Sequence, residues 1–358
     1  MKHILVLCLA TLIGCKSSAP DVPVDVDGGI DADVDSGVPP RTGRVSTLSG
    51  SAESGYVDGS RSEARFSNPV NLVVGPDGKV YVADFDNFKI RVVEADGAVS
   101  TLFTLAGFQR PFGMAFASDG TLYVSTDRNP QGTQNLMSGT IWTIDIVAKT
   151  ATPLVESIGR PRGLAVLPDG RIVATDFVHH VVELVDPVTR EVRVLAGTWD
   201  QAGRTDGIGD LARFSNPYGV VVVNGEIVVA DRSNHQLRKI ALDGTVSTLA
   251  GTGVAGFTDG ALATAAFNRP HALAATANGD IYITDLDNFR VRRISSGTVD
   301  TIAGNGTGGH ADSDDRLAAQ FYGIEGLSAV ADGSKLFVAD GGRGENVPYN
   351  RIRTIEMQ

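Results

Sequence analysis

The sequence is poor in cysteine, in basic charge and in long apolar runs. Its two cysteines, Cys8 and Cys15, both lie within the first 15 of 358 residues, so the rest of the chain can form no disulfide. Lys and Arg number 31 against 42 Asp and Glu, a formal net charge of −11. Because nucleic-acid phosphates require a basic face, we expect no nucleic-acid partner. The longest apolar run, Ile4–Ile13, is too short to cross a bilayer.

Residues 1–14 are typical of a secretion signal. Lys2 precedes the apolar run Ile4–Ile13, and the run ends in Leu-Ile-Gly before Cys15. This ending resembles a bacterial lipobox, in which the signal is cut before the cysteine and the thiol is acylated. The resemblance implies a fatty-acid (palmitate-type) anchor on Cys15 and attachment to the membrane of the cell envelope. Lys16 in place of Asp implies the outer membrane, on its periplasmic or surface side. An ordinary signal peptide with an incidental cysteine is the alternative.

The lipidated cysteine begins a segment, 15–41, that we predict to be a disordered acidic linker. Six Asp alternate there with Val, Ala, Gly and Pro, a composition that cannot bury enough apolar area to fold. Asp31, Asp33 and Asp35 resemble the start of a calcium loop, but Ser36 stands at the turn glycine and Thr42 at the bidentate glutamate. We therefore predict a solvated spacer without a metal site.

A five-residue strand motif, which we call the phrase, repeats along the rest of the chain. It recurs about every fifty residues. Each copy is the second strand of a predicted four-stranded unit, with one strand before it and two strands after it. Tight turns such as Pro76-Asp77-Gly78 separate the first strand of a unit from the phrase. The six copies are Val80–Asp84, Leu122–Thr126, Ile172–Asp176, Ile227–Asp231, Ile281–Asp285 and Leu336–Asp340.

The two ends of the repeat array complement each other. The sixth unit ends after three strands, and its missing fourth strand matches Val45–Leu48, which precedes the first unit. The N-terminal strand can therefore complete the last unit and close a ring, which leaves only short protected edges. This pattern predicts an all-β, six-bladed β-propeller over residues 42–358.

The turn between the second and third strands carries a family resemblance. Asp231–Arg238 reads Asp-Arg-Ser-Asn-His-Gln-Leu-Arg and resembles the Asp-x-x-Asn-His-x-Leu-Arg signature of NHL repeats. Asp84–Arg91 and Asp285–Arg292 match it with Phe at the His place, whereas the third unit has His179 where Asn is expected. The resemblance implies a six-bladed NHL propeller. It implies little about function, because this fold serves binding modules and enzymes alike.

Two kinds of repeated motif have a structural interpretation. Gly251-x-Gly253-x-x-Gly256 and its counterpart from Gly304 resemble a dinucleotide fingerprint, but no helix follows either, so we predict blade-to-blade loops and no nucleotide. The Asp that ends the phrase recurs in five units, and an Arg recurs in the third strand. A group needed identically in several blades is expected to serve the scaffold rather than catalysis.

One position varies while its neighbours do not, and it starts the innermost strand of each blade. One such side chain from each blade should converge at the central channel, on the face that bears the blade-to-blade loops. Two aromatic residues, an Arg, a His and a Glu suit a small polar or anionic ligand. An inert plug of the channel is the alternative. The occupants are Val70, Phe112, Arg162, Tyr218, His271 and Glu325.

The best functional interpretation is a non-catalytic module that binds a ligand or protein through Phe112, Arg162, Tyr218, His271 and Glu325. The alternative is a lyase or hydrolase that uses His271, Arg162, Tyr218 and Glu325. Propeller lyases acting on peptidyl-α-hydroxyglycine resemble this arrangement but hold their metal with several His, and zinc needs three protein ligands. Lactonases use acids and Asn, for which Glu325 and Asn71 are the matching residues. We predict no cofactor and no metal.

Five loops are expected to surround the site. They are Ser49–Gly59, Asp127–Thr140, Gly197–Gly207, Gly251–Gly260 and Gly304–Ser313.

Overall fold

A computed structural model describes residues 43–345 and 347–357 of the chain. The predicted signal peptide 1–14, the lipid anchor on Cys15 and the linker as far as residue 41 lie outside the described residues. Within the described ranges, no helix has both the length and the apolar character that a membrane span requires.

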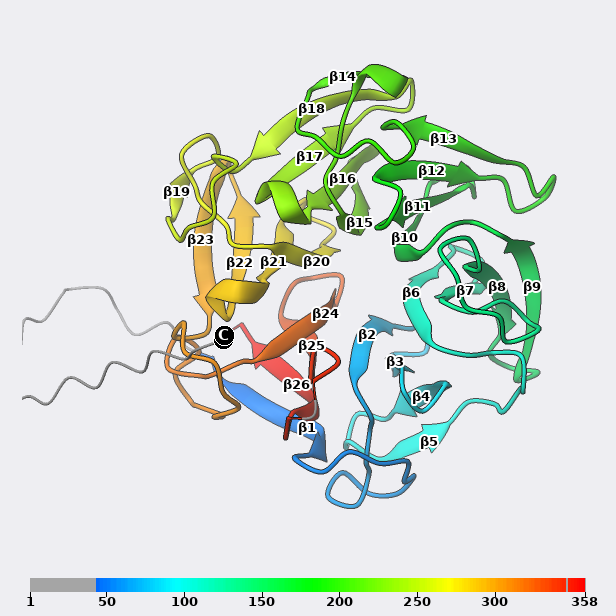
Figure 1. Cartoon of the computed structure of the whole chain (residues 1–358). Coiled ribbons are helices and arrows are strands. Elements are labelled where there is room, and N and C mark those ends of the chain that lie inside the picture. The colour runs from blue at the N-terminus through cyan, green and yellow to red at the C-terminus, as the bar shows by residue number, and fades with distance from the viewer. Residues whose placement is uncertain (1–42, 346, 358) are drawn as a thin grey trace, which may run out of the picture. The chain divides into compact units, whose positions relative to one another are not determined.

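The described residues form six antiparallel sheets, arranged as the blades of a propeller (Figure 1). The predicted six-bladed all-β fold is thereby confirmed. Blade 1 contains β2 (Pro69–Val74), β3 (Val80–Asp84), β4 (Lys89–Val93) and β5 (Val99–Thr101), and blade 2 contains β6 (Pro111–Phe116), β7 (Leu122–Thr126), β8 (Thr140–Asp145) and β9 (Thr150–Glu156). Blade 3 contains β10 (Pro161–Val166), β11 (Ile172–Asp176), β12 (Val181–Val185) and β13 (Val192–Ala196).

The remaining blades follow the same order, and two of them have a fifth strand. Blade 4 contains β15 (Pro217–Val223), β16 (Glu226–Asp231), β17 (Gln236–Ile240) and β18 (Thr245–Ala250), with β14 (Gly207–Ile208) outside them. Blade 5 contains β20 (Pro270–Ala275), β21 (Ile281–Asp285), β22 (Arg290–Ser295) and β23 (Thr298–Ala303), with β19 (Gly260–Ala261) outside them. Blade 6 contains β24 (Gly323–Ala329), β25 (Lys335–Gly341), β26 (Asn350–Glu356) and β1 (Val45–Ser51), and three 3-10 turns, η1 (Gly209–Leu211), η2 (Arg232–Asn234) and η3 (Leu286–Asn288), complete the elements.

Blade 6 closes the ring as the sequence predicts. Its sheet order is β1-β26-β25-β24, and β1 pairs antiparallel with β26 from Val45 opposite Ile355 to Ser51 opposite Asn350. Figure 1 shows the two ends of the described chain side by side in this blade. A strand from each end of the array thus satisfies edges that would otherwise stay open.

The core lies between neighbouring blades. A phenylalanine precedes the inner strand of five blades and is fully buried or nearly so, which lets each blade pack its apolar face on the next. The apolar clusters accordingly join side chains of adjacent blades, as Phe321 does with residues of blades 5 and 6. The five residues are Phe66, Phe108, Phe214, Phe267 and Phe321.

The repeated acids and arginines are structural, as predicted. In blade 5 the buried Arg292 donates from Nη1 to Asp285 Oδ2 at 2.7 Å, and from Nη2 to Asp259 Oδ1 at 2.6 Å. Asp285 also accepts from the Asn268 backbone and from the Asn288 side chain. Each arginine therefore ties the turn of its own blade to the loop that enters the blade. The equivalent arginines are Arg91, Arg238 and Arg353.

The loop acid belongs to a short segment that pairs with the outermost strand of the blade, and we call this segment a cap. Gly260 of the blade 5 cap pairs antiparallel with Val299, and Asp259 accepts from the Thr301 backbone at 3.1 Å. Four of the five loops predicted to surround the site contribute caps in this way. The sequence did not predict the caps, because each is only two or three residues long. The caps centre on Asp58-Gly59, Asp206-Gly207, Asp259-Gly260 and Asp312-Ser313.

Candidate functional site

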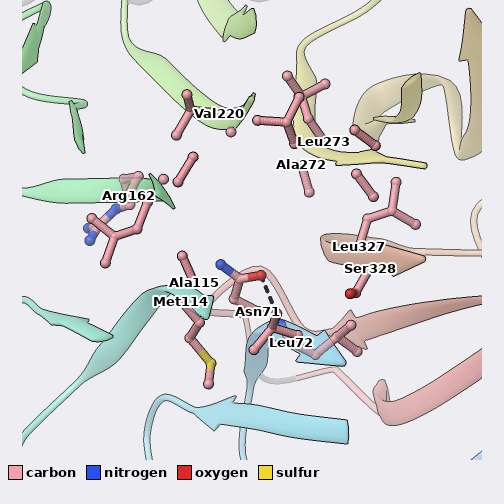
Figure 2. A pocket seen from close by; sticks show the side chains of 18 of the residues that line it. Asn71, Leu72, Met114, Ala115, Arg162, Val220, Ala272, Leu273, Leu327 and Ser328 are labelled. Atoms are coloured by element: carbon pink, nitrogen blue, oxygen red, sulfur yellow. Dashed lines mark hydrogen bonds between the residues drawn. The ribbon is translucent and has the colours of Figure 1, made fainter. Parts of the chain in front are cut away.

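The six inner strands, β2, β6, β10, β15, β20 and β24, surround a central cavity of about 350 Å³. Such a volume is in the range of small-molecule sites. Figure 2 shows the cavity from close by, with Leu72, Val220, Leu273 and Leu327 among its walls. Most of the side chains that line the cavity are apolar, although the exposed surface of its walls is more polar than apolar. The few polar side chains that reach the cavity are the groups that can distinguish one ligand from another.

The variable residues that start the inner strands converge at one end of this cavity, and we call them the ring. The Tyr218 ring lies 5.6 Å from that of Phe112 and 3.6 Å from that of His271, measured between centroids. The Arg162 guanidinium carbon lies 4.2 Å from the centre of the Phe112 ring. The structure therefore brings together Phe112, Arg162, Tyr218, His271 and Glu325, as the predicted register requires.

The ring is not open on the face of the blade-to-blade loops, where the sequence analysis placed it. Val70, Phe112, Arg162, Tyr218 and His271 are all buried, since three ring systems and a guanidinium fill the narrow circle. The ring thus closes most of one end of the cavity, which we call the sealed end, and Glu325 is its one partly exposed member. At the opposite end the inner-strand residues are partly exposed, so the cavity opens toward the face of the tight turns. The partly exposed residues are Val74, Phe116, Val166, Val222, Ala275 and Ala329.

Arg162 forms an ion pair with a residue that does not line the cavity. Both of its terminal nitrogens pair with the buried Asp127 carboxylate, and Arg160 pairs with the same carboxylate. Burial acts to lower the pKa of Arg162, but the Asp127 charge prevails and leaves that pKa raised. Figure 2 shows the guanidinium directed away from the middle of the cavity. Arg162 therefore forms a wall of the site and does not carry a free charge.

His271 is also held within the protein. Its Nδ1 lies 3.0 Å from the Glu325 carbonyl oxygen, and its Nε2 lies 4.0 Å from Glu325 Oε1. The residue is 1% exposed and does not line the cavity. Burial, then the charge of Arg232, lowers its pKa well below the ordinary value, so the imidazole is neutral at physiological pH. Among the described residues, no three His, Cys, Asp or Glu side chains could hold a metal ion.

Three polar groups at the sealed end stay free. Within the described residues, the Glu325 carboxyl, the Tyr218 hydroxyl and the Asn71 Nδ2 donate or accept no hydrogen bond, whereas Asn71 Oδ1 accepts from the Leu72 backbone at 2.8 Å. Figure 2 shows the Asn71 amide directed toward the middle of the cavity. Unmet hydrogen-bonding side chains at the end of a cavity lined mostly by apolar side chains are the features that orient a bound ligand.

Glu325 can change its charge near neutral pH. Its side chain is 13% exposed, and burial raises its pKa to about 7, although Arg343, Arg232 and Arg162 oppose the shift. Burial likewise raises the pKa of Tyr218 above its ordinary value, so the phenol stays protonated and can donate a hydrogen bond. The sealed end therefore offers two donors and one titratable acceptor.

Asn71 was not among the predicted binding residues and entered only as a match to the lactonase type. At the equivalent position in the other blades only Gly or Ala occurs, because the inner strand of the next blade lies close. A Cβ at Gly113, for example, would lie 2.8 Å from the Arg162 carbonyl oxygen. The sequence signal for Asn71 was a polar side chain at a position where every other blade has a small residue. These small residues are Gly113, Gly163, Gly219, Ala272 and Gly326.

Comparison with protein families confirms the predicted repeat. Three segments, residues 66–93, 214–240 and 267–294, match the NHL repeat model. They correspond to blades 1, 4 and 5, whose turns carry the signature closest to that of the family.

Relatives by sequence share parts of the chain. The Arabidopsis thaliana protein SUPPRESSOR OF QUENCHING 1, chloroplastic, is 28% identical over an alignment of 285 residues, and the match covers 69% of this chain and 27% of that protein. The human NHL repeat-containing protein 2 is 39% identical over 87 residues, 24% of this chain and 12% of that protein. The chain thus spans well under half the length of these relatives.

Solved structures share the fold over most of the chain. An auxiliary nutrient binding protein from Bacteroides thetaiotaomicron has a TM-score of 0.68 and 20% identity, and the match covers 87% of this chain and 76% of that one. A virginiamycin B lyase from Staphylococcus aureus, solved as an inactive variant with quinupristin, has a TM-score of 0.51 and 14% identity over 83% and 84% of the two chains. At these identities the likeness is one of fold.

Proposed function

The chain is a six-bladed propeller built of NHL repeats, and we propose that it is a non-catalytic binding module whose small ligand occupies the central cavity. The observation that carries this proposal is the set of free polar groups at the sealed end, Asn71, Tyr218 and Glu325, in a cavity whose other lining side chains are mainly apolar. A ligand that fits has an apolar body and one polar end. The auxiliary nutrient binding protein that shares the fold supports a binding role.

The polar end of the ligand is expected to donate a hydrogen bond to Glu325. The ionised carboxylate is a strong acceptor, and Tyr218 and Asn71 beside it can bond to a hydroxyl or carbonyl of the same ligand. Phe112 and the aliphatic walls would cover the apolar body. His271 and Arg162 take part indirectly, since they hold the ring together.

The first test is a screen of small amines, alcohols and carboxylic acids of equal carbon number, read as ligand-induced stabilisation at pH 8. We expect amines or alcohols to stabilise the protein more than the matched acids. Loss of a hydrogen bond to a charged group corresponds to about 1.5–3 kcal/mol, so Glu325→Gln should weaken a confirmed binder at least about tenfold. The exposed Glu226→Gln is the matched control. Equal binding to both variants would contradict the proposal.

One observation favours the alternative function, a lyase or hydrolase centred on His271. Its Nε2 lies 4.0 Å from Glu325 Oε1, a distance that a bound substrate could shorten, and a lyase shares the fold. Burial of His271 within the ring, away from the cavity lining, favours binding over chemistry. If a ligand from the screen is converted and His271→Ala retains binding but abolishes conversion, the alternative replaces the first proposal.

The propeller is further proposed to be tethered to the cell envelope, at the outer membrane, through lipidated Cys15. This rests on the lipobox resemblance and the acidic spacer of the sequence. Membrane fractionation of wild type and Cys15→Ala tests it. The variant should move from the membrane to the soluble fraction, and retention in the membrane would refute the anchor.

A further inference from the structure

The outer edges of the blades are not equally protected. In blades 1, 4, 5 and 6 a cap covers the outermost strand. In blade 1, for example, the Val99 and Gly59 backbones exchange hydrogen bonds of 2.8 and 3.0 Å. The cap acid, Asp58, accepts from the Thr101 backbone at 3.0 Å and from the buried Arg91 at 2.6 Å. Each cap therefore supplies both strand pairing and a counter-charge.

Blades 2 and 3 have no cap among the described residues, because the loops that enter them are short. Blade 2 protects its edge by sequence, since Pro153 lies opposite Trp142 on β8 and removes an outward N–H. Blade 3 has no such protection. At the equivalent register Val194 lies opposite Glu183, and Val192 and Val194 are 38% and 42% exposed. Within the described residues, the backbone N–H groups of Val192 and Val194 donate no hydrogen bond outside the sheet of blade 3.

Beneath this edge, blade 3 has an acidic residue where the capped blades have a basic one. Glu183 takes the place of the arginine found in the capped blades, with the same register relative to the turn acid Asp176. Glu183 is 3% exposed, and its Oε2 has no hydrogen-bond partner in the part of the chain that the structure describes. Asp176 interacts instead with His179, whose Nδ1 lies 2.5 Å from Asp176 Oδ2. The carboxyl of Glu183 thus lacks the counter-charge that a cap provides elsewhere.

We propose that the outer edge of β13 is a docking edge for an extended segment of a partner protein, which pairs antiparallel with Val192 and places a Lys or Arg against Glu183. The four caps within the molecule are the template for this geometry. The charges are reversed relative to the caps, since the sheet supplies the acid and the partner the base. Strand addition of this kind draws affinity from backbone hydrogen bonds and specificity from the side chain that enters the pocket.

The charge also argues against a second copy of the chain as the occupant. Two β13 edges paired with each other would give neither Glu183 a base, because Arg193 of the same strand lies next to Val194 and therefore on the opposite face of the sheet. Both buried carboxyls would stay without a counter-charge. A basic segment satisfies the same groups. The site is distinct from the central cavity and does not depend on the proposed function.

The test uses a fluorescein-labelled heptapeptide with Thr-Lys-Gly at its centre, after the Thr-Asp-Gly of the blade 4 and 5 caps, and the Thr-Asp-Gly peptide as its partner. Fluorescence anisotropy with the full chain at pH 9, where Glu183 is ionised, should show at least tenfold tighter binding of the Lys peptide. Val194→Pro copies Pro153 of blade 2 and should abolish binding. Val194→Thr, the residue of the capped blades, keeps the N–H and should retain binding.

A charge exchange makes the test sharper. Glu183→Gln should weaken the Lys peptide at least tenfold, and Glu183→Arg should reverse the preference in favour of the Asp peptide. Circular dichroism checks that each variant folds, and Val194→Pro supplies an independent result if Glu183→Arg does not. Equal binding of the two peptides, unchanged binding by Val194→Pro, or a dimer that Val194→Pro disrupts without peptide binding would overturn the proposal.

Discussion

Glu183 makes the stability of the propeller depend on pH in a direction that can be worked out. Burial, reinforced by the Asp176 charge, raises its pKa from 4.5 to about 8. Between these values the folded state binds more protons than the unfolded state, so stability falls as the pH rises from about 4.5 to about 8. One pH unit corresponds to about 1.4 kcal/mol, so the full effect is at most about 5 kcal/mol.

Glu183→Gln removes this titration while keeping the shape of the side chain. The variant should match the wild type near pH 5 and exceed its stability by a few kcal/mol at pH 9. A domain of roughly 315 residues shifts its Tm by about 1.5 °C per kcal/mol, so the expected gain at pH 9 is about 4–7 °C. Thermal unfolding followed by circular dichroism from pH 5 to 9 measures it. Parallel pH profiles of the two proteins would refute the assignment of a buried, unpaired carboxyl.

The other predictions concern the scaffold and the cavity. Asp285→Ala leaves Arg292 buried without its inner partner and should cost about 3–5 kcal/mol in urea unfolding, whereas the exposed Asp243→Ala should cost little. Gly113→Ala should lower the Tm, because the new Cβ would lie 2.8 Å from the Arg162 carbonyl oxygen, whereas Gly256→Ala has room for its Cβ. Because burial raises the pKa of Glu325 to about 7, an amine that stays charged throughout should bind more tightly at pH 8 than at pH 6, and Glu325→Gln should abolish that dependence in calorimetric titrations.

The repeat made most of the fold predictable from the sequence. A phrase with a period of about fifty residues, together with the displaced strand Val45–Leu48, determines the number of blades and the closure of the ring. It also identifies the ring residues, because equivalent positions can be aligned by eye. These features are local in sequence or repeated, so no knowledge of the packing is needed to find them.

The direction of the cavity and the differences between blade edges could not be predicted. Whether Phe112, Tyr218 and His271 leave an opening or close one depends on how their rings pack across the channel, which no spacing reveals. The caps are too short to give a strand pattern. The exchange of Arg for Glu183 was visible in the sequence, but its meaning required the observation that blade 3 also lacks the cap acid.

The most direct test of the central claim is the location of a bound ligand. Side-chain amide and backbone chemical shifts of the labelled protein, titrated with the amine or alcohol selected by the screen, report that location. We predict that the Asn71 side-chain amide and the inner strands β2, β15 and β24 shift together, and that Glu325→Gln suppresses these shifts. Shifts confined to the blade-to-blade loops, with Asn71 unchanged, would contradict a ligand site in the cavity.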